Sequence, residues 1–159
     1  MAIDLNDKLG STWFGGALPP RIRERLAALA EVRSVEPGAV LLREGADTDR
    51  FGVLLNGLLA LRVAVAGRGT ATLLTVEPGD VYGWSAIVPP HRATCSVVAL
   101  TASEVLLVEG SRLRDLLSAD DGVASAVYPQ LLRSVSRRLD ATRTQLLDLY
   151  ARDREYEPW

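Results

Sequence analysis

Apolar residues recur at two different spacings along this chain, and the change of spacing divides it into three parts. Ile22, Leu26 and Leu29 lie three or four residues apart, which predicts a short helix with two prolines at its start. From residue 31 to residue 109, short apolar runs alternate with turn sequences, which predicts strands. After Gly110 the spacing is helical again. The pattern therefore predicts a mainly β fold with flanking helices.

The expected strands share an apolar composition and short length, and they cover residues 40–42, 51–55, 58–65, 73–76, 93–99 and 105–108. Asn56-Gly57 stands between two of these runs and predicts a tight hairpin, because both residue types accept a positive φ. Gly67-Arg68-Gly69 predicts a second, looser hairpin.

A short sequence that occurs twice in the chain gives information on the topology. Residues 34–40 and 75–81 share a Val-Glu-Pro-Gly core, in which proline sets the first turn position and glycine accepts a positive φ at the second. Two equivalent corners separated by a set of strands suit a β jelly roll of two Greek keys.

The last third of the chain predicts a short helix followed by a long one. Ser111 is a candidate cap for the first, and Asp120 or Asp121 for the second. The long helix carries a narrow seam at heptad spacing, formed by Leu132, Val135, Leu139, Thr142, Leu146 and Leu149. A helix packed only on its own barrel needs a wider apolar stripe, so the seam favours a parallel helix pair and a homodimer.

These patterns suggest four parts: an N-terminal arm over residues 1–16, a jelly roll with short flanking helices over 17–119, a long C-terminal dimerisation helix over 120–150, and a tail over 151–159. The end of the tail, residues 156–159, is either frayed or a docking aromatic segment.

Composition narrows the function classes. With 18 basic and 20 acidic residues, the net charge of −2 does not indicate binding to DNA or to an anionic membrane. Cys95 is the single cysteine and His91 the single histidine, so a disulfide, a His-rich metal site and a Ser-His pair are not expected. No signal segment or membrane-length apolar run is evident. We expect a cytoplasmic protein that is not an enzyme and has no cofactor.

One segment, residues 79–94, has a layout suited to a small anion. Gly83 opens about one helical turn, two prolines end it, and Arg92 follows at the start of a strand. Backbone N–H groups at a helix start attract negative charge, and an arginine can grip a phosphate with two parallel bonds. The alternative is a surface turn with a solvated arginine, because short glycine-plus-arginine patterns are common.

The ordered set of elements resembles the cyclic nucleotide-binding domain of the cyclic-AMP receptor protein and fumarate-nitrate regulator family. The resemblance covers roughly residues 18–150. It is carried by Leu41-Leu42-Arg43-Glu44-Gly45, by Phe51-Gly52-Val53-Leu54-Leu55-Asn56-Gly57, by Pro78-Gly79-Asp80, and by the segment from Tyr82-Gly83 to Arg92-Ala93-Thr94.

The resemblance implies a ligand site and a dimer. Backbone donors to a cyclic phosphate would come from Gly83, Ser85 and Ala86, and Arg92, next to Ala93, would pair with the phosphate. Thr142 falls where the family places a hydroxyl near the purine, on the helix that pairs two subunits. The implied ligand is cyclic AMP or cyclic GMP.

The chain departs from the family pattern in two places. Trp84 stands where the family has a glutamate that binds the ribose 2′-hydroxyl, and an indole cannot accept that bond. A ribose hydroxyl left without an acceptor costs about 1–3 kcal/mol. Trp84 could instead stack on the ligand or fill the pocket. The family's helix-turn-helix domain is also not expected here, so we expect no DNA binding by this chain itself.

Three hypotheses follow. The first is a stand-alone, dimeric cyclic nucleotide sensor that signals to an unidentified effector protein through protein contact. The second is a degenerate, ligand-free dimerisation or adaptor domain in which Trp84 fills the pocket. The third is a sensor of a different small anionic ligand, since Arg92 alone does not demand a cyclic nucleotide.

Overall fold

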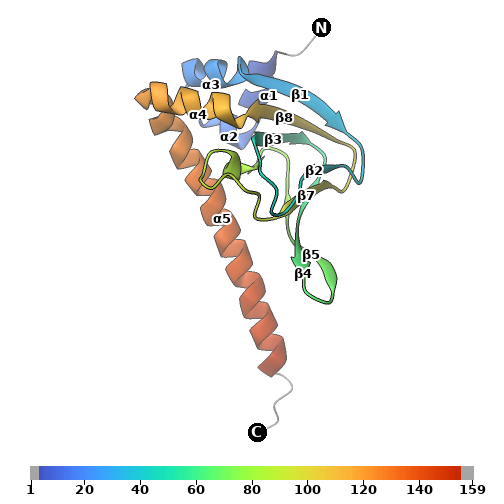
Figure 1. The fold of residues 1–159 in the computed structure, drawn as a ribbon. Coiled ribbons are helices and arrows are strands. Elements are labelled where there is room, and N and C mark those ends of the chain that lie inside the picture. Colours follow the sequence, from blue (N-terminus) through green and yellow to red (C-terminus); the bar gives the residue numbers. More distant parts are fainter. Residues whose placement is uncertain (1–3, 155–159) are drawn as a thin grey trace.

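Two antiparallel four-stranded sheets face each other in the computed structural model, which describes residues 4–154 (Figure 1). One sheet has the order β1 (Ala30–Val35), β8 (Ser103–Glu109), β3 (Arg50–Asn56) and β6 (Val81–Tyr82). The other has the order β2 (Val40–Leu42), β7 (Ser96–Ala99), β4 (Leu59–Val65) and β5 (Gly69–Val76).

Helices flank this β roll. Most of them gather at one end of the roll, and one long helix runs past it (Figure 1). The helices are α1 (Leu5–Gly10), α2 (Trp13–Gly16), α3 (Pro20–Ala27), α4 (Gly110–Ala119) and α5 (Asp121–Arg154), and a single 3₁₀ turn, η1 (Trp84–Ala86), follows β6. The predicted jelly roll with flanking helices and a long C-terminal helix is confirmed.

The core consists of two apolar clusters. One lies between the sheets and contains Leu54, Leu59 and Tyr82, all essentially buried. The other lies under the helices, where Phe14 of α2 packs on Phe51 of β3 with ring centroids 5.8 Å apart. The segment expected to be an N-terminal arm therefore contributes to the core.

The turn at Asn56-Gly57 differs from its prediction. It does not close a hairpin, because β3 pairs with β6 and β8 while β4 pairs with β5 and β7. The turn instead carries the chain from one sheet to the other, with Gly57 at φ 97°. Local turn chemistry is the same in both cases, so the sequence signal does not reveal which sheet the next strand joins. The predicted hairpin at residues 67–69 is confirmed, since Val65 pairs with Gly69.

The two predicted helix N-caps have different outcomes in the structure. Asp120 caps α5 as predicted, and the N–H of Val123 is the main reason why the pKa of its carboxyl group is lowered. The predicted cap of α4 by Ser111 is wrong. That helix begins at Gly110, and Asp49, distant in sequence, accepts the Ser111 N–H at 2.9 Å.

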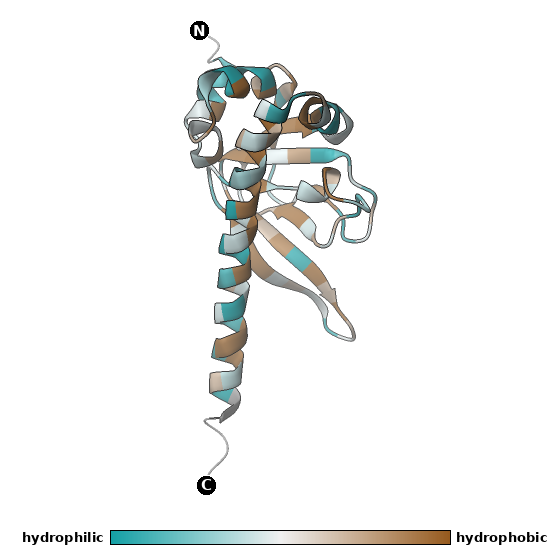
Figure 2. Ribbon diagram, turned by 90° about the vertical axis from the view of Figure 1, so that its left-hand side faces the viewer, coloured by the Kyte–Doolittle hydropathy of each residue, from teal (hydrophilic) through white to brown (hydrophobic). Residues whose placement is uncertain are grey.

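Helix α5 has two faces with different environments. Its inner face packs on the roll through Val123, Val127, Leu131 and Ser134, all buried. The heptad seam lies on another face and is exposed, with Leu132 at 67% and Leu139 at 59%. Apolar and polar positions alternate down the projecting part of α5 (Figure 2). No helix within residues 4–154 is both long and apolar enough to cross a bilayer.

The crossover at Gly57 can be tested against a matched glycine. A Cβ added at Gly57 would lie 2.1 Å from Ser103 Oγ and 2.7 Å from Ser103 Cα, whereas one at Gly67, also at positive φ, meets nothing within 4 Å. Gly67→Ala should lower the free energy of unfolding by about 1–2 kcal/mol, the backbone term alone. Gly57→Ala should lower it by at least about 1 kcal/mol more, because the site is overpacked. Urea unfolding of both variants measures the difference, and equal losses would contradict the crowding described here.

Candidate functional site

The predicted anion-binding segment forms a tight turn directly after β6. Gly83 takes φ 75°, and a Cβ there would lie 2.5 Å from the carbonyl oxygen of Arg50. One 3₁₀ turn follows, closed by the Ala86 N–H donating to the Gly83 carbonyl at 3.0 Å. The predicted glycine-opened helical turn is confirmed, and close packing on the neighbouring strand requires glycine at its start.

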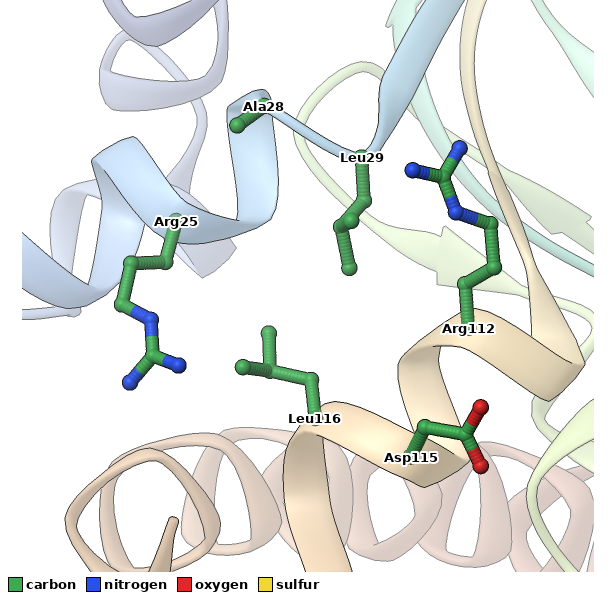
Figure 3. Close-up of a pocket in the computed structure, with 6 residues that line it drawn as sticks. All are labelled: Arg25, Ala28, Leu29, Arg112, Asp115 and Leu116. Carbon is green, nitrogen blue, oxygen red and sulfur yellow. The ribbon is translucent and has the colours of Figure 1, made fainter. Parts of the chain in front are cut away.

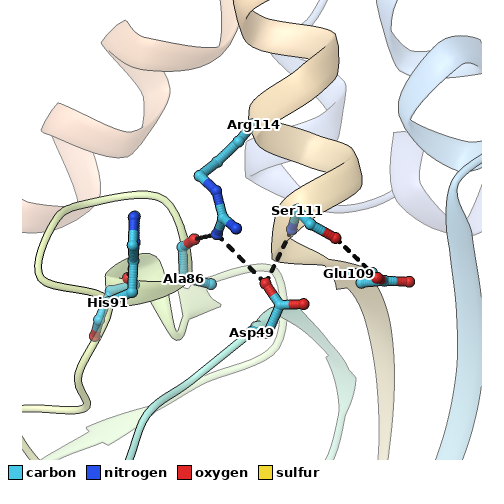
Figure 4. A network of polar contacts seen from close by, with 7 residues as sticks. Asp49, Ala86, His91, Glu109, Ser111 and Arg114 are labelled. Carbon is cyan, nitrogen blue, oxygen red and sulfur yellow. Dashed lines mark hydrogen bonds and ion pairs between the residues drawn. The ribbon is translucent and has the colours of Figure 1, made fainter.

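Polar contacts connect the turn formed by Gly83 and η1 to α4. The Arg114 guanidinium donates to the Ala86 carbonyl and, at 3.3 Å, to Asp49 Oδ1, which also accepts the Ser111 N–H (Figure 4). His91 Nδ1 lies 3.0 Å from the Ser85 carbonyl oxygen. The position of the turn is thus linked to the start of α4.

A small pocket lies beside the turn. Its volume is about 30 Å³, and its walls are formed by Leu42, Leu61, Gly83, Trp84, Ser85, Ala93, Thr94, Cys95, Val97 and Arg138. A space of this size holds one or two water molecules, whereas pockets for small organic ligands measure about 300–1,000 Å³. The site is therefore closed in this structure.

Arg138 of α5 closes the pocket. Its guanidinium carbon lies 4.6 Å from the centre of the Trp84 ring, and its side chain is only 11% exposed. Nη2 donates to the Val81 carbonyl and, at 3.3 Å, to Asp80 Oδ2. Burial lowers the pKa of Arg138, and the Asp80 carboxylate opposes that shift. The pocket thus contains a buried cation next to an aromatic face.

Cys95 lies in the same pocket and is partly buried. Burial raises the pKa of its thiol, and the nearby Arg138 charge opposes this effect. Cys95 lies directly before β7, and its thiol is protonated at neutral pH.

The residues expected to bind a ligand do not all meet at this pocket. Gly83, Trp84, Ser85 and Ala93 line it. Ala86 is fully buried and does not, and its N–H already donates within the turn. Backbone donors from this turn are thus partly used in the closed structure.

Arg92 and Thr142 also lie outside the pocket lining. Arg92 Nε and Nη2 both donate to the Gly45 carbonyl, at 3.0 and 2.6 Å, and its side chain is 61% exposed. The Thr142 hydroxyl donates to the Arg138 carbonyl within its own helix, at 2.8 Å. The guanidinium beside Trp84 therefore belongs to Arg138 and not to Arg92.

Sequence analysis did not single out Arg138 or its partner Asp80. A signal for Arg138 existed: Ser134 and Arg138 continue the inner stripe of α5 set by Val127 and Leu131, at steps of four, three and four. Polar residues that extend a buried stripe need polar partners on the packed element. The Pro-Gly-Asp corner offered one in Asp80.

Larger hollows lie elsewhere on the described part of the chain. One of about 390 Å³ lies between α3 and α4, with Leu29 and Leu116 facing each other and Arg25 and Arg112 at its sides (Figure 3). It shares no residue with the pocket at Trp84. Within residues 4–154, no group of three or more His, Cys, Asp or Glu side chains is arranged to hold a metal ion.

Comparison with known proteins gives a consistent picture. The family model for the cyclic nucleotide-binding domain matches residues 32–120. A CRP-like cAMP-activated global transcriptional regulator from Mycobacterium tuberculosis is 30% identical over 118 residues, which are 73% of this chain. The chain spans about half the length of that relative, 50%.

Solved structures share the fold. A cyclic nucleotide-binding domain from Methylobacillus flagellatus superposes with a TM-score of 0.78 at 17% identity, covering 91% of this chain and 82% of that one. The N-terminal domain of a transcriptional regulator from Streptomyces coelicolor gives a TM-score of 0.66 at 26% identity, covering 88% and 95%. The family match, which includes the turn after Gly83, shows that this chain belongs to the cyclic nucleotide-binding domain family.

Proposed function

We propose that this chain is a regulatory module that binds a cyclic nucleotide, forms a homodimer through α5 and signals to an effector protein by contact. The observation that carries the proposal is the meeting of the Gly83 turn with α5 at one pocket, through Trp84 and Arg138. A ligand that enters there has different contacts with α5 from those in the closed state, and so it shifts the position of the helix.

Arg92 supports the phosphate-binding part of the proposal. It lies at the end of the segment that begins with Gly83, and its only side-chain hydrogen bonds within residues 4–154 go to the Gly45 carbonyl. The Asp47 carboxylate lies 3.8 Å from Nε, and a phosphate offers this exposed guanidinium charged acceptors in place of the Gly45 carbonyl.

The dimer rests on the exposed heptad seam. Leu132, Leu139 and Leu149 are 67%, 59% and 60% exposed on a helix that projects beyond the roll. Isolated apolar side chains on a surface are ordinary, but a heptad row of them is the pattern that a second helix covers. The family is regulatory, and we assign no catalytic step to this chain.

The closed pocket favours one alternative, a ligand-free dimerisation or adaptor domain. About 30 Å³ of space beside Trp84 excludes a nucleotide from the site as it stands. Under this alternative, Trp84 and Arg138 are permanent parts of the core and α5 does not move.

Titration calorimetry with cyclic AMP and cyclic GMP separates the two. We expect binding to the unmodified chain and a loss of at least about tenfold in affinity for Arg92→Ala, because a hydrogen bond to a charged group contributes about 1.5–3 kcal/mol. Arg68→Ala, in the exposed β4–β5 turn, is the control and should bind like the unmodified chain. No heat and no thermal shift with either nucleotide at millimolar concentration would leave the adaptor domain and the sensor of a different small anion as alternatives.

The dimer can be tested at the seam. Leu139→Asp combined with Leu146→Asp should convert a dimer into a monomer, because two charges would be buried at the helix interface. Thr144→Asp, an exposed position on the opposite side of α5 from the seam, should leave the dimer intact. Sedimentation velocity measures the mass of each variant. A monomeric unmodified chain would contradict the proposed homodimer.

A further inference from the structure

Arg138 is unusual among the arginines of α5 because it points into a pocket. Arg133 and Arg137 lie over Trp13, with guanidinium carbons 5.7 and 5.3 Å from its ring centre. Arg138 lies over Trp84 instead, at 4.6 Å, and it is one of the residues that wall the pocket. Neighbouring arginines of the same helix thus fasten it to different parts of the molecule.

Three groups position the Arg138 guanidinium. The Trp84 ring supplies an aromatic face, the Asp80 carboxylate a charge, and the Val81 carbonyl an acceptor. A cation over tryptophan is favourable, more so when both are shielded from water. Trp84, which cannot accept a bond from a ribose hydroxyl, is well suited to this contact.

The same arginine is incompletely satisfied. Its Nε is buried and finds no acceptor within residues 4–154, and the Asp80 contact is long, at 3.3 Å. A buried donor without a partner is costly. Departure of Arg138 from the pocket would give Nε a partner in water, which offsets part of the loss of its other contacts.

Displacement would also free a stretch of α5. Beyond Ser134, which donates to Asp80 Oδ1 at 2.8 Å, the hydrogen bonds from the described part of α5 to the roll come from Arg138 and Gln145. Gln145 donates to the Leu73 carbonyl of β5 at 2.8 Å. If the Arg138 bonds are lost, the Gln145 bond is the one hydrogen bond that still joins this described part of α5 to the roll.

We propose that Arg138 sets the ligand affinity of this site by competing for it: its guanidinium on Trp84 closes the pocket, and a ligand enters only when Arg138 leaves. The identity of the ligand in this inference rests on the proposed function. The closure of the pocket by Arg138 rests on the geometry alone. If the closed form accounts for about nine molecules in ten, its removal raises apparent affinity about tenfold.

The closure can be measured without any ligand, because Cys95 is the single cysteine and lies in the pocket. Arg138→Ala should make the Cys95 thiol react about tenfold faster with an aromatic disulfide reagent at fixed pH, by the same population argument. Removing the arginine also removes a charge that lowers the pKa of Cys95, which by itself slows the reaction. Opening the pocket also relieves the burial that raises the pKa of this thiol, so a faster reaction reports exposure of Cys95 to solvent.

Two further variants complete the test. Arg137→Ala, at the contact with Trp13, is the control and should react like the unmodified chain. Asp80→Asn keeps an oxygen acceptor for the Val81 N–H and the Ser134 hydroxyl but removes the charge beside Arg138. It should also accelerate the reaction, and it serves if Arg138→Ala fails to fold. An unchanged rate in the folded variants would overturn the proposal whatever the nucleotides do.

Calorimetry with cyclic AMP and cyclic GMP supplies the second readout. Arg138→Ala should bind about ten times more tightly than the unmodified chain, since no competitor remains. Weaker binding would make Arg138 a ligand contact and overturn the proposal. If no variant binds either nucleotide but Cys95 becomes reactive, the closure by Arg138 is supported and the proposed function fails.

Discussion

The Asp80 carboxylate is the contact on which the arrangement of this molecule depends. It follows the second Pro-Gly corner, and it accepts the Val81 N–H and the Ser134 hydroxyl, each at 2.8 Å, and the Arg138 guanidinium. One side chain therefore joins the start of β6, the inner face of α5 and the closed pocket. Because the carboxylate is only 15% exposed, water replaces these bonds poorly.

A short stretch of chain joins Asp80 to the Gly83 turn, so the contacts with α5 lie next to the pocket. Tyr82, buried between the sheets, fixes β6, and Gly83 lets the chain turn against the Arg50 carbonyl. The turn is fastened on its far side by Arg114 of α4. The turn thus contacts α4 through Arg114 and α5 through Arg138.

The predictable features were those encoded by neighbours in sequence. The Pro-Gly corners, the 67–69 hairpin and the Gly83 turn depend on backbone preferences of a few residues, and all three are present. The Asn56-Gly57 turn has equally clear local chemistry, yet β3 does not pair with the strand that follows the turn. It pairs with β8, which lies between β1 and β3 in the first sheet. In the same way, Asp49 replaces Ser111 as the α4 cap because a distant segment brings its carboxylate to the helix start.

The sequence by itself determined the fold class, the family and the segment that forms the site, because hydrophobic spacing and turn residues are properties of short stretches. Only the tertiary structure decided which side chains meet there. Arg92 is exposed on the Gly45 carbonyl, and Arg138, 46 positions further along the chain, lies on Trp84 in its place. Arg138 reaches Trp84 because of the way α5 packs against the roll. The buried stripe of the helix and Asp80 together set that packing.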